Sequence, residues 1–118
     1  MSTDPRKAGD GWIGVDFDGT LAHYDGKFHG EDHTGAPVEE MVKRVRRWLA
    51  DGRDVRLFTA RRPTAVLRRW MKEHLGQVLP ITNQKDHHMQ ALYDDRVVQV
   101  KRNEGTTHED HERQVWQK

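Results

Sequence analysis

Residues 12–20 read Trp-Ile-Gly-Val-Asp-Phe-Asp-Gly-Thr, an apolar run that ends in two acids one residue apart. Because side chains alternate along a strand, Asp16 and Asp18 would project to the same side while Phe17 turns into the core. One carboxylate of such a pair can attack an electrophile while its neighbour transfers a proton. The glycine and threonine that follow would let the backbone come close to an anionic group. The stretch therefore predicts a buried strand with a chemically active carboxyl end.

Length and composition indicate one domain with a thin core. The chain has 118 residues, of which 34% are hydrophobic and 33% are charged, a polar balance for a globular protein. We expect the domain at residues 11–102, a flexible N-terminus at residues 1–10, and a tail at residues 103–118 that is flexible or forms a short helix. Cysteine is absent and no apolar stretch is long enough to cross a bilayer, so we expect a cytoplasmic protein without membrane insertion.

Hydrophobic periodicity predicts alternating strands and helices. Apolar residues recur at intervals of three and four from Val38 to Leu49 and from Val66 to Leu75, as on the buried face of an amphipathic helix. Residues 21–36 show no sustained period and predict an irregular flap or a tight hairpin. Strands are expected at residues 12–15, 54–59, 78–82, 91–93 and 97–100. This alternation predicts an α/β fold with a parallel sheet of about five strands.

Polar residues gather where the expected strands end. Parallel sheets bind ligands at the carboxyl ends of their strands, because those ends meet at one edge. The residues at or just after the expected strand ends are Asp16, Asp18, Thr59, Asn83, Lys85, Asp94 and Asp95. We therefore expect these side chains to form one site.

The order and placement of these residues resemble the four motifs of the haloacid dehalogenase (HAD) superfamily of phosphatases. The first motif corresponds to residues 15–21, and the other three correspond to Thr59, Lys85 and the pair Asp94-Asp95. The resemblance covers residues 12–100 and is strongest to the small uncapped members found in phages and bacteria. It implies a minimal Rossmann-like fold, a three-layer sandwich with strand order 5-4-1-2-3 and no cap domain.

The resemblance also implies an enzyme, a Mg²⁺-dependent phosphomonoester hydrolase that forms an aspartyl-phosphate intermediate. Asp16 would be the nucleophile, and Asp18 would protonate the leaving oxygen. Lys85 and Thr59 would stabilise the transferring phosphoryl group. Substrate contacts are expected from Gly19, Thr20, Asn83 and Arg61, although Arg61 could equally be a charge that flanks a helix. Mg²⁺ would be held by Asp16, Asp18, Asp94 and Asp95.

The sequence leaves three functional hypotheses open. The substrate would be a small phosphorylated metabolite or nucleotide, or it would be the terminal phosphate of a nucleic acid, because the chain resembles, more distantly, the 3′-phosphatase domain of polynucleotide kinases. Residues 43–72 contain eleven Lys or Arg and two Asp, which would attract a polyanion or simply form the solvated outer face of two helices. The third hypothesis is a non-catalytic phosphate-binding or regulatory module. The sequence does not indicate an oligomeric state.

Overall fold

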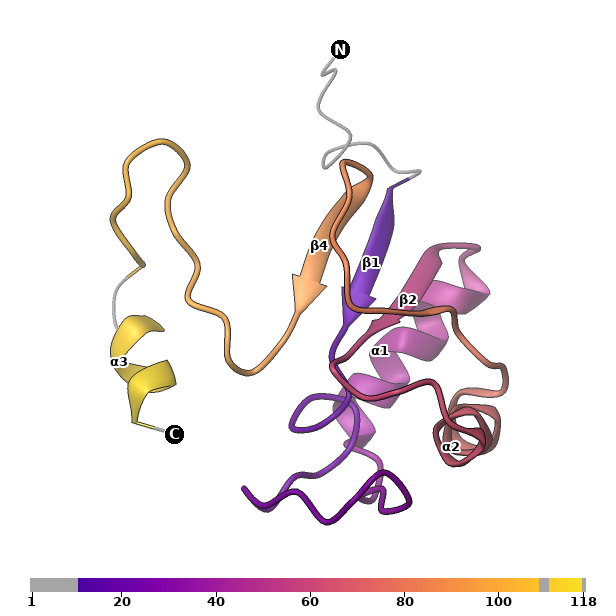
Figure 1. The fold of residues 1–118 in the computed structure, drawn as a ribbon. Coiled ribbons are helices and arrows are strands. Elements are labelled where there is room, and N and C mark those ends of the chain that lie inside the picture. Colours follow the sequence, from indigo (N-terminus) through magenta and orange to yellow (C-terminus); the bar gives the residue numbers. More distant parts are fainter. Residues whose placement is uncertain (1–10, 109–110, 118) are drawn as a thin grey trace.

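The computed structural model describes residues 11–108 and 111–117, which form alternating strands and helices as expected. In chain order the elements are β1 (Trp12–Val15), α1 (Glu39–Ala50), β2 (Asp54–Phe58), α2 (Ala65–Leu75), β3 (Ile81–Thr82), β4 (Met89–Tyr93) and α3 (His111–Trp116). The N-terminus expected to be flexible, residues 1–10, lies outside the described residues. The protein is therefore an α/β protein, as its periodicity predicts (Figure 1).

The strands form one parallel sheet with β1 at its centre. The strand order is β3-β2-β1-β4, which confirms the order expected for the first four strands. Val15 at the end of β1 lies opposite Leu57 of β2 and Tyr93 of β4. Every residue of β1 is buried, as in a strand packed on both faces. The carboxyl ends of three neighbouring strands therefore lie side by side.

The fifth strand expected at residues 97–100 does not form, so the sheet has four strands rather than five. The backbone N–H of Arg96 donates to Asp94 Oδ1 at 2.8 Å, and this turn follows directly after β4. Val97 and Val100 are exposed by 43% and 56%, and Val100 forms an isolated antiparallel bridge with Thr107. A run of β-branched residues becomes a strand only where it finds a partner edge, and this run turns away from β4.

One face of the sheet carries the hydrophobic core. Ile13 and Val15 of β1 lie beside Val55 and Leu57 of β2, and these side chains share that face. The helices cover them with apolar residues at positions 42, 45, 67, 70, 71 and 75. Consecutive right-handed crossovers that run in one direction place both helices on the same side of a sheet. The layer formed by α1 and α2 therefore packs entirely against this face.

The opposite face is crossed by an irregular segment instead of a helix, which corrects the expected three-layer sandwich. The β3–β4 connection, residues 83–88, passes over the sheet on the side opposite α1 (Figure 1). Trp12 Nε1 donates to Asp86 Oδ1 at 2.7 Å, and Arg56 Nη1 lies 3.8 Å from Asp86 Oδ2. Six residues are too few for the helix that a parallel crossover usually contains. The connection is instead held to the sheet by side-chain contacts.

The two long helices begin and end near the predicted residues. Thr64 precedes α2, and its hydroxyl oxygen accepts a hydrogen bond from Leu67 N at 3.2 Å, as in an N-cap. Gly76 follows α2 with a φ of 86°, which only glycine adopts without strain. Leu67, Trp70, Met71 and Leu75 form the buried side of α2. The helical period of the sequence thus marks the face that packs on the sheet.

The flap, residues 21–36, is an irregular loop whose two ends pair with each other. His23 N donates to Ala36 O at 2.8 Å, and Val38 N donates to Leu21 O at 2.7 Å. Gly35 is required there, because a Cβ would lie 2.0 Å from His23 O. The loop between these ends lies at the carboxyl edge of the sheet, since Tyr24 and Phe28 share a cavity with Asp16 there.

The tail leaves the sheet after β4 and ends in α3, where Trp116 is 79% exposed (Figure 1). Part of the tail, residues 103–118, thus forms the short helix considered from the sequence, although residues 109, 110 and 118 lie outside the described chain. Among the described helices, none has the length and apolar character needed to cross a membrane.

Replacing Asp86 with Ala should destabilise the fold, because Trp12 would lose its hydrogen-bond acceptor and Arg56 an ion-pair partner. We expect the free energy of unfolding to fall, because the buried indole N–H of Trp12 would lose its acceptor, and urea denaturation measures the loss. Asp54→Ala is the matched control, since Asp54 pairs with the same Arg56 at 3.0 Å and its side chain is exposed by 46%, against 51% for Asp86. Its loss should stay below about 0.5 kcal/mol, and equal losses would contradict this anchoring role of Asp86.

Candidate functional site

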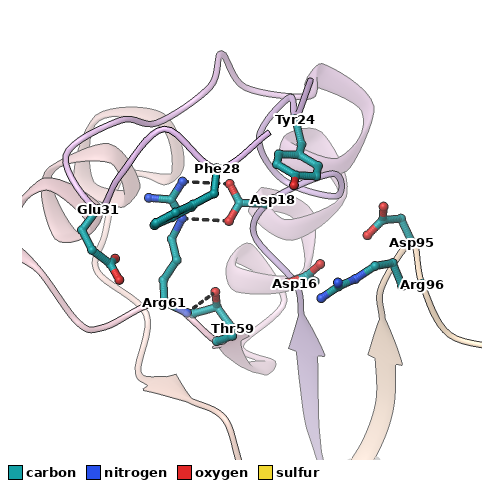
Figure 2. A pocket seen from close by; sticks show the side chains of 10 residues that line it. Asp16, Asp18, Tyr24, Phe28, Glu31, Thr59, Arg61, Asp95 and Arg96 are labelled. Atoms are coloured by element: carbon teal, nitrogen blue, oxygen red, sulfur yellow. Dashed lines mark hydrogen bonds and ion pairs between the residues drawn. The ribbon is translucent and has the colours of Figure 1, made fainter. Parts of the chain in front are cut away.

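A cavity of about 300 Å³ opens at the carboxyl edge of the sheet. Its walls come from the segments that follow β1, β2 and β4 and from the flap. The lining residues are Asp16, Asp18, Tyr24, Phe28, Glu31, Thr59, Ala60, Arg61, Asp95 and Arg96 (Figure 2). The residues predicted from the sequence that meet in this cavity are Asp16, Asp18, Thr59, Arg61 and Asp95.

Asp16 directly follows β1 and is 8% exposed. Its backbone N–H donates to Tyr93 O at 2.9 Å, so the pairing with β4 continues one residue beyond the strand. Burial raises the pKa of Asp16 to about 7, and the charges of Asp94 and Asp95 contribute to the increase. The positive charge of Arg96 acts in the opposite direction. A cation close to Asp16 would favour its ionised, nucleophilic form near neutral pH.

Three carboxylates lie close enough together to hold a metal ion. Carboxylate oxygens of Asp16, Asp94 and Asp95 all lie within 4.8 Å of one another. Gly19 makes room for this cluster, because a Cβ at this position would lie 2.6 Å from Asp95 Oδ2. A set of carboxylate oxygens fits a hard divalent cation of the Mg²⁺ type. Asp16 and Asp95 also line the cavity, so a cation held by the cluster would face a bound ligand.

Asp18, expected to be the second catalytic acid and a metal ligand, is bound to Arg61. Arg61 Nε donates to Asp18 Oδ2 at 2.7 Å, and Arg61 Nη2 donates to Asp18 Oδ1 at 2.9 Å. The Arg61 side chain is 8% exposed, and its guanidinium lies 5.2 Å from the ring centroid of Phe17 and 5.8 Å from that of Phe28. Both oxygens of Asp18 thus accept hydrogen bonds from one buried cation, which also lines the cavity.

Thr59 is buried at the end of the segment that continues β2. Its backbone N–H donates to Thr82 O at 3.0 Å, and its hydroxyl oxygen accepts a hydrogen bond from Arg61 N at 3.1 Å. The hydroxyl proton can therefore be donated into the cavity that Thr59 lines. Thr20 is not among the lining residues, and its buried Oγ1 has no hydrogen-bond partner.

The structure does not bring Lys85 and Asn83 to the cavity, although the sequence placed both in the site. Both residues are exposed and lie in the short connection between β3 and β4. That connection runs back across the sheet, and the neighbour of Lys85, Asp86, bonds to Trp12 at the start of β1. The cations that line the cavity are instead Arg61 and Arg96.

The sequence reasoning missed five lining residues: Tyr24, Phe28, Glu31, Ala60 and Arg96. Three of them lie in the flap, where the absence of a period gives no indication of orientation. The available signal was two aromatic residues in an otherwise polar, glycine-rich segment. Tyr24 and Phe28 are 48% and 64% exposed, and exposed aromatic groups often mark binding surfaces.

Comparison with known proteins identified no relative of this chain. No protein-family model, curated protein or solved structure matches the chain. The case for a function therefore rests on the chemistry and geometry of the cavity.

Proposed function

We propose that the protein is a phosphomonoester hydrolase of the HAD type that forms an aspartyl-phosphate on Asp16. The observation that carries this proposal is the position of Asp16. It is a buried acid at the end of the central strand, clustered with Asp94 and Asp95 beside a cavity that Arg61 and Arg96 also line. This arrangement combines a nucleophile, a cation site and donors for phosphoryl oxygens.

In the first step, an ionised oxygen of Asp16 attacks the phosphorus of the substrate, and the bond from phosphorus to the leaving oxygen breaks. The leaving oxygen takes a proton from Asp18 and departs as an alcohol. In the second step, water gives a proton back to Asp18 and attacks the phosphorus, the bond from phosphorus to the Asp16 oxygen breaks, and inorganic phosphate leaves with the Asp16 carboxylate restored. Mg²⁺, held by Asp16, Asp94 and Asp95, would supply charge neutralisation and polarisation of the phosphoryl oxygens. Thr59 and Arg96 line the cavity, and the Thr59 hydroxyl and the Arg96 guanidinium would donate hydrogen bonds to those oxygens.

Asp18 can act as the proton donor only if Arg61 releases it and binds another group. In the structure both Asp18 oxygens accept hydrogen bonds from Arg61, so Asp18 acts there as an acceptor and not as a proton donor. A phosphoryl group carries the same kind of paired acceptor oxygens that a guanidinium binds in bidentate fashion. Substrate phosphate would therefore compete with Asp18 for Arg61, and binding of substrate would release the acid that the reaction needs.

The basic stretch at residues 43–72 gives the nucleic-acid hypothesis no added support from the structure. Arg61 is its one member that lines the cavity. Arg46 donates to His74 O at 3.1 Å on the outer side of α1 and α2, and Arg56 is paired with Asp54 and Asp86. Two other hypotheses stay predictions: hydrolysis of a phosphate at a nucleic-acid end, and a non-catalytic phosphate-binding role. An activity assay that includes phosphorylated oligonucleotides distinguishes both from hydrolysis of a small phosphomonoester.

Asp16→Asn should abolish phosphate release, because the amide cannot form the covalent intermediate. We expect a loss of at least about 10³-fold, as for removal of a catalytic nucleophile, with Mg²⁺ present and a panel of small phosphomonoesters and phosphorylated oligonucleotides as substrates. Asp51→Asn, an exposed acid at the end of α1, is the control and should retain full activity. No release by the wild-type protein on any member of the panel would contradict the proposal.

Asp16→Asn should also change how stability depends on pH. Since the folded pKa of Asp16 is about 7, the folded protein keeps a proton between about pH 4 and pH 7 that the unfolded chain has lost. The free energy of unfolding of the wild-type protein therefore falls as pH rises through that interval. Without metal, the variant should gain on the order of 3 kcal/mol relative to wild type between pH 4 and pH 8. Urea denaturation in chelator measures this difference, and parallel pH profiles would contradict the burial of an ionisable Asp16.

Arg61→Lys should weaken substrate binding, because an ammonium group cannot bind two oxygens in a fixed fork. We expect the KM for a phosphomonoester to rise about tenfold or more. Arg62→Lys makes the same change at the exposed neighbouring residue and should leave the KM unchanged. Steady-state kinetics of both variants test the point, and equal KM values for Arg61→Lys and wild type would show that Arg61 does not bind the phosphate.

A further inference from the structure

Two oppositely charged side chains of the cavity carry buried atoms without a hydrogen-bond partner. These atoms are Nη1 of Arg61 and Oε2 of Glu31. Figure 2 shows the unbonded nitrogen of Arg61 turned away from Asp18, toward the side on which Glu31 lies. A buried donor or acceptor without a partner is unfavourable, so such atoms usually contact a ligand or an ordered water. The pair offers one donor and one acceptor to whatever enters the cavity.

Two aromatic rings of the flap border the same space. Phe28 lies over the Arg61 guanidinium, and Tyr24 lies near Asp18 (Figure 2). Both rings are largely exposed, so neither is held in place by core packing. Flat π faces beside hydrogen-bonding groups are suited to a planar, heteroaromatic ligand.

We propose that Tyr24, Phe28, Glu31 and Arg61 form a recognition site for the nucleobase of a nucleotide substrate. Every nucleobase has an edge on which an N–H donor lies next to an oxygen or nitrogen acceptor. Glu31 Oε2 would accept from the N–H, and Arg61 Nη1 would donate to the neighbouring acceptor. The ring would stack on Phe28 or Tyr24. Sugar phosphates have no aromatic face and would leave both rings unused.

The position of this recognition site relative to Asp16 fits one nucleotide unit. The base-binding groups and the proposed nucleophile line one cavity of about 300 Å³, within the range of sites that enclose a single small ligand. The phosphate would lie near Asp16 and the base under the flap. This inference rests on the proposed hydrolase activity for the position of the phosphate, but base recognition can be measured without hydrolysis.

The first test compares nucleoside monophosphates with ribose 5-phosphate, which carries the same reacting group without a base. We expect kcat/KM to be at least about tenfold higher for the nucleotides, the effect of one stacked base. Phe28→Leu and Glu31→Gln should each move the ratio of the two values toward one. Glu40→Gln, an exposed acid on α1, is the control and should leave the ratio unchanged. Equal kcat/KM values for nucleotides and ribose 5-phosphate would overturn the inference while leaving the hydrolase proposal intact.

The second test measures binding of nucleosides and of ribose to the Asp16→Asn protein by calorimetry. Binding of nucleosides that Phe28→Leu and Glu31→Gln weaken about tenfold would support base recognition even if no phosphomonoester is hydrolysed. Absence of nucleoside binding at millimolar concentration would overturn it. Oligonucleotides with a terminal phosphate, with and without a base on the terminal nucleotide, identify the source of the nucleotide. Preference for the intact over the abasic oligonucleotide would assign the site to the end of a strand. Preference for mononucleotides would assign it to the free compound. If removing the base changes binding neither of the oligonucleotide nor of the mononucleotide, the inference is contradicted.

Discussion

The parallel pairing of β1 with both β2 and β4 is the constraint on which the site depends. β1 contributes only four residues, all of them buried between its two neighbours. The hydrogen bond from Asp16 N to Tyr93 O extends this pairing past the end of the strand. Asp16 is therefore fixed beside Asp94 and Asp95, and the three acids cannot separate to reduce their repulsion without breaking the ladder. Burial of Asp16 at the end of this strand raises its pKa, and the neighbouring charge of Asp94 adds to the increase.

Features of the sequence with a regular period predicted the structure best. The apolar positions of residues 38–49 and 66–75 match the buried faces of α1 and α2, because helix packing is a local property of spacing. The prediction of a strand at residues 97–100 was wrong, because strand pairing is not a local property. It depends on an available sheet edge, which local composition does not reveal. Lys85 was misplaced because strand order alone does not show the path of a six-residue connection. The flap also lines the cavity, but its sequence has no hydrophobic period from which the orientation of its side chains could be predicted.

Arg61 links parts of the site that lie far apart in the sequence. Its backbone N–H is held by Thr59, while its side chain joins Asp18 and lies against the rings of Phe17 and Phe28. Asp18 orients the guanidinium, because its two carboxylate oxygens accept hydrogen bonds from Nε and Nη2 of Arg61. The third nitrogen, Nη1, has no hydrogen-bond partner and points away from Asp18, toward Glu31 of the flap (Figure 2). One buried cation thus lies between Asp18 and the flap, where a ligand on either side would alter its contacts.

The charge of the cavity sets the order in which its ligands can bind. Four acids line it, Asp16, Asp18, Glu31 and Asp95, against the two arginines Arg61 and Arg96. A phosphate dianion about 4 Å from one carboxylate is repelled by roughly 8 kcal/mol at an effective dielectric constant near 20. Protonation of Asp16 would relieve this repulsion, but a protonated acid is a poor nucleophile. A cation on Asp16, Asp94 and Asp95 relieves the repulsion while keeping Asp16 ionised. In the proposed reaction, productive binding of a phosphomonoester would therefore require that the acid cluster first exchange its proton for a metal ion.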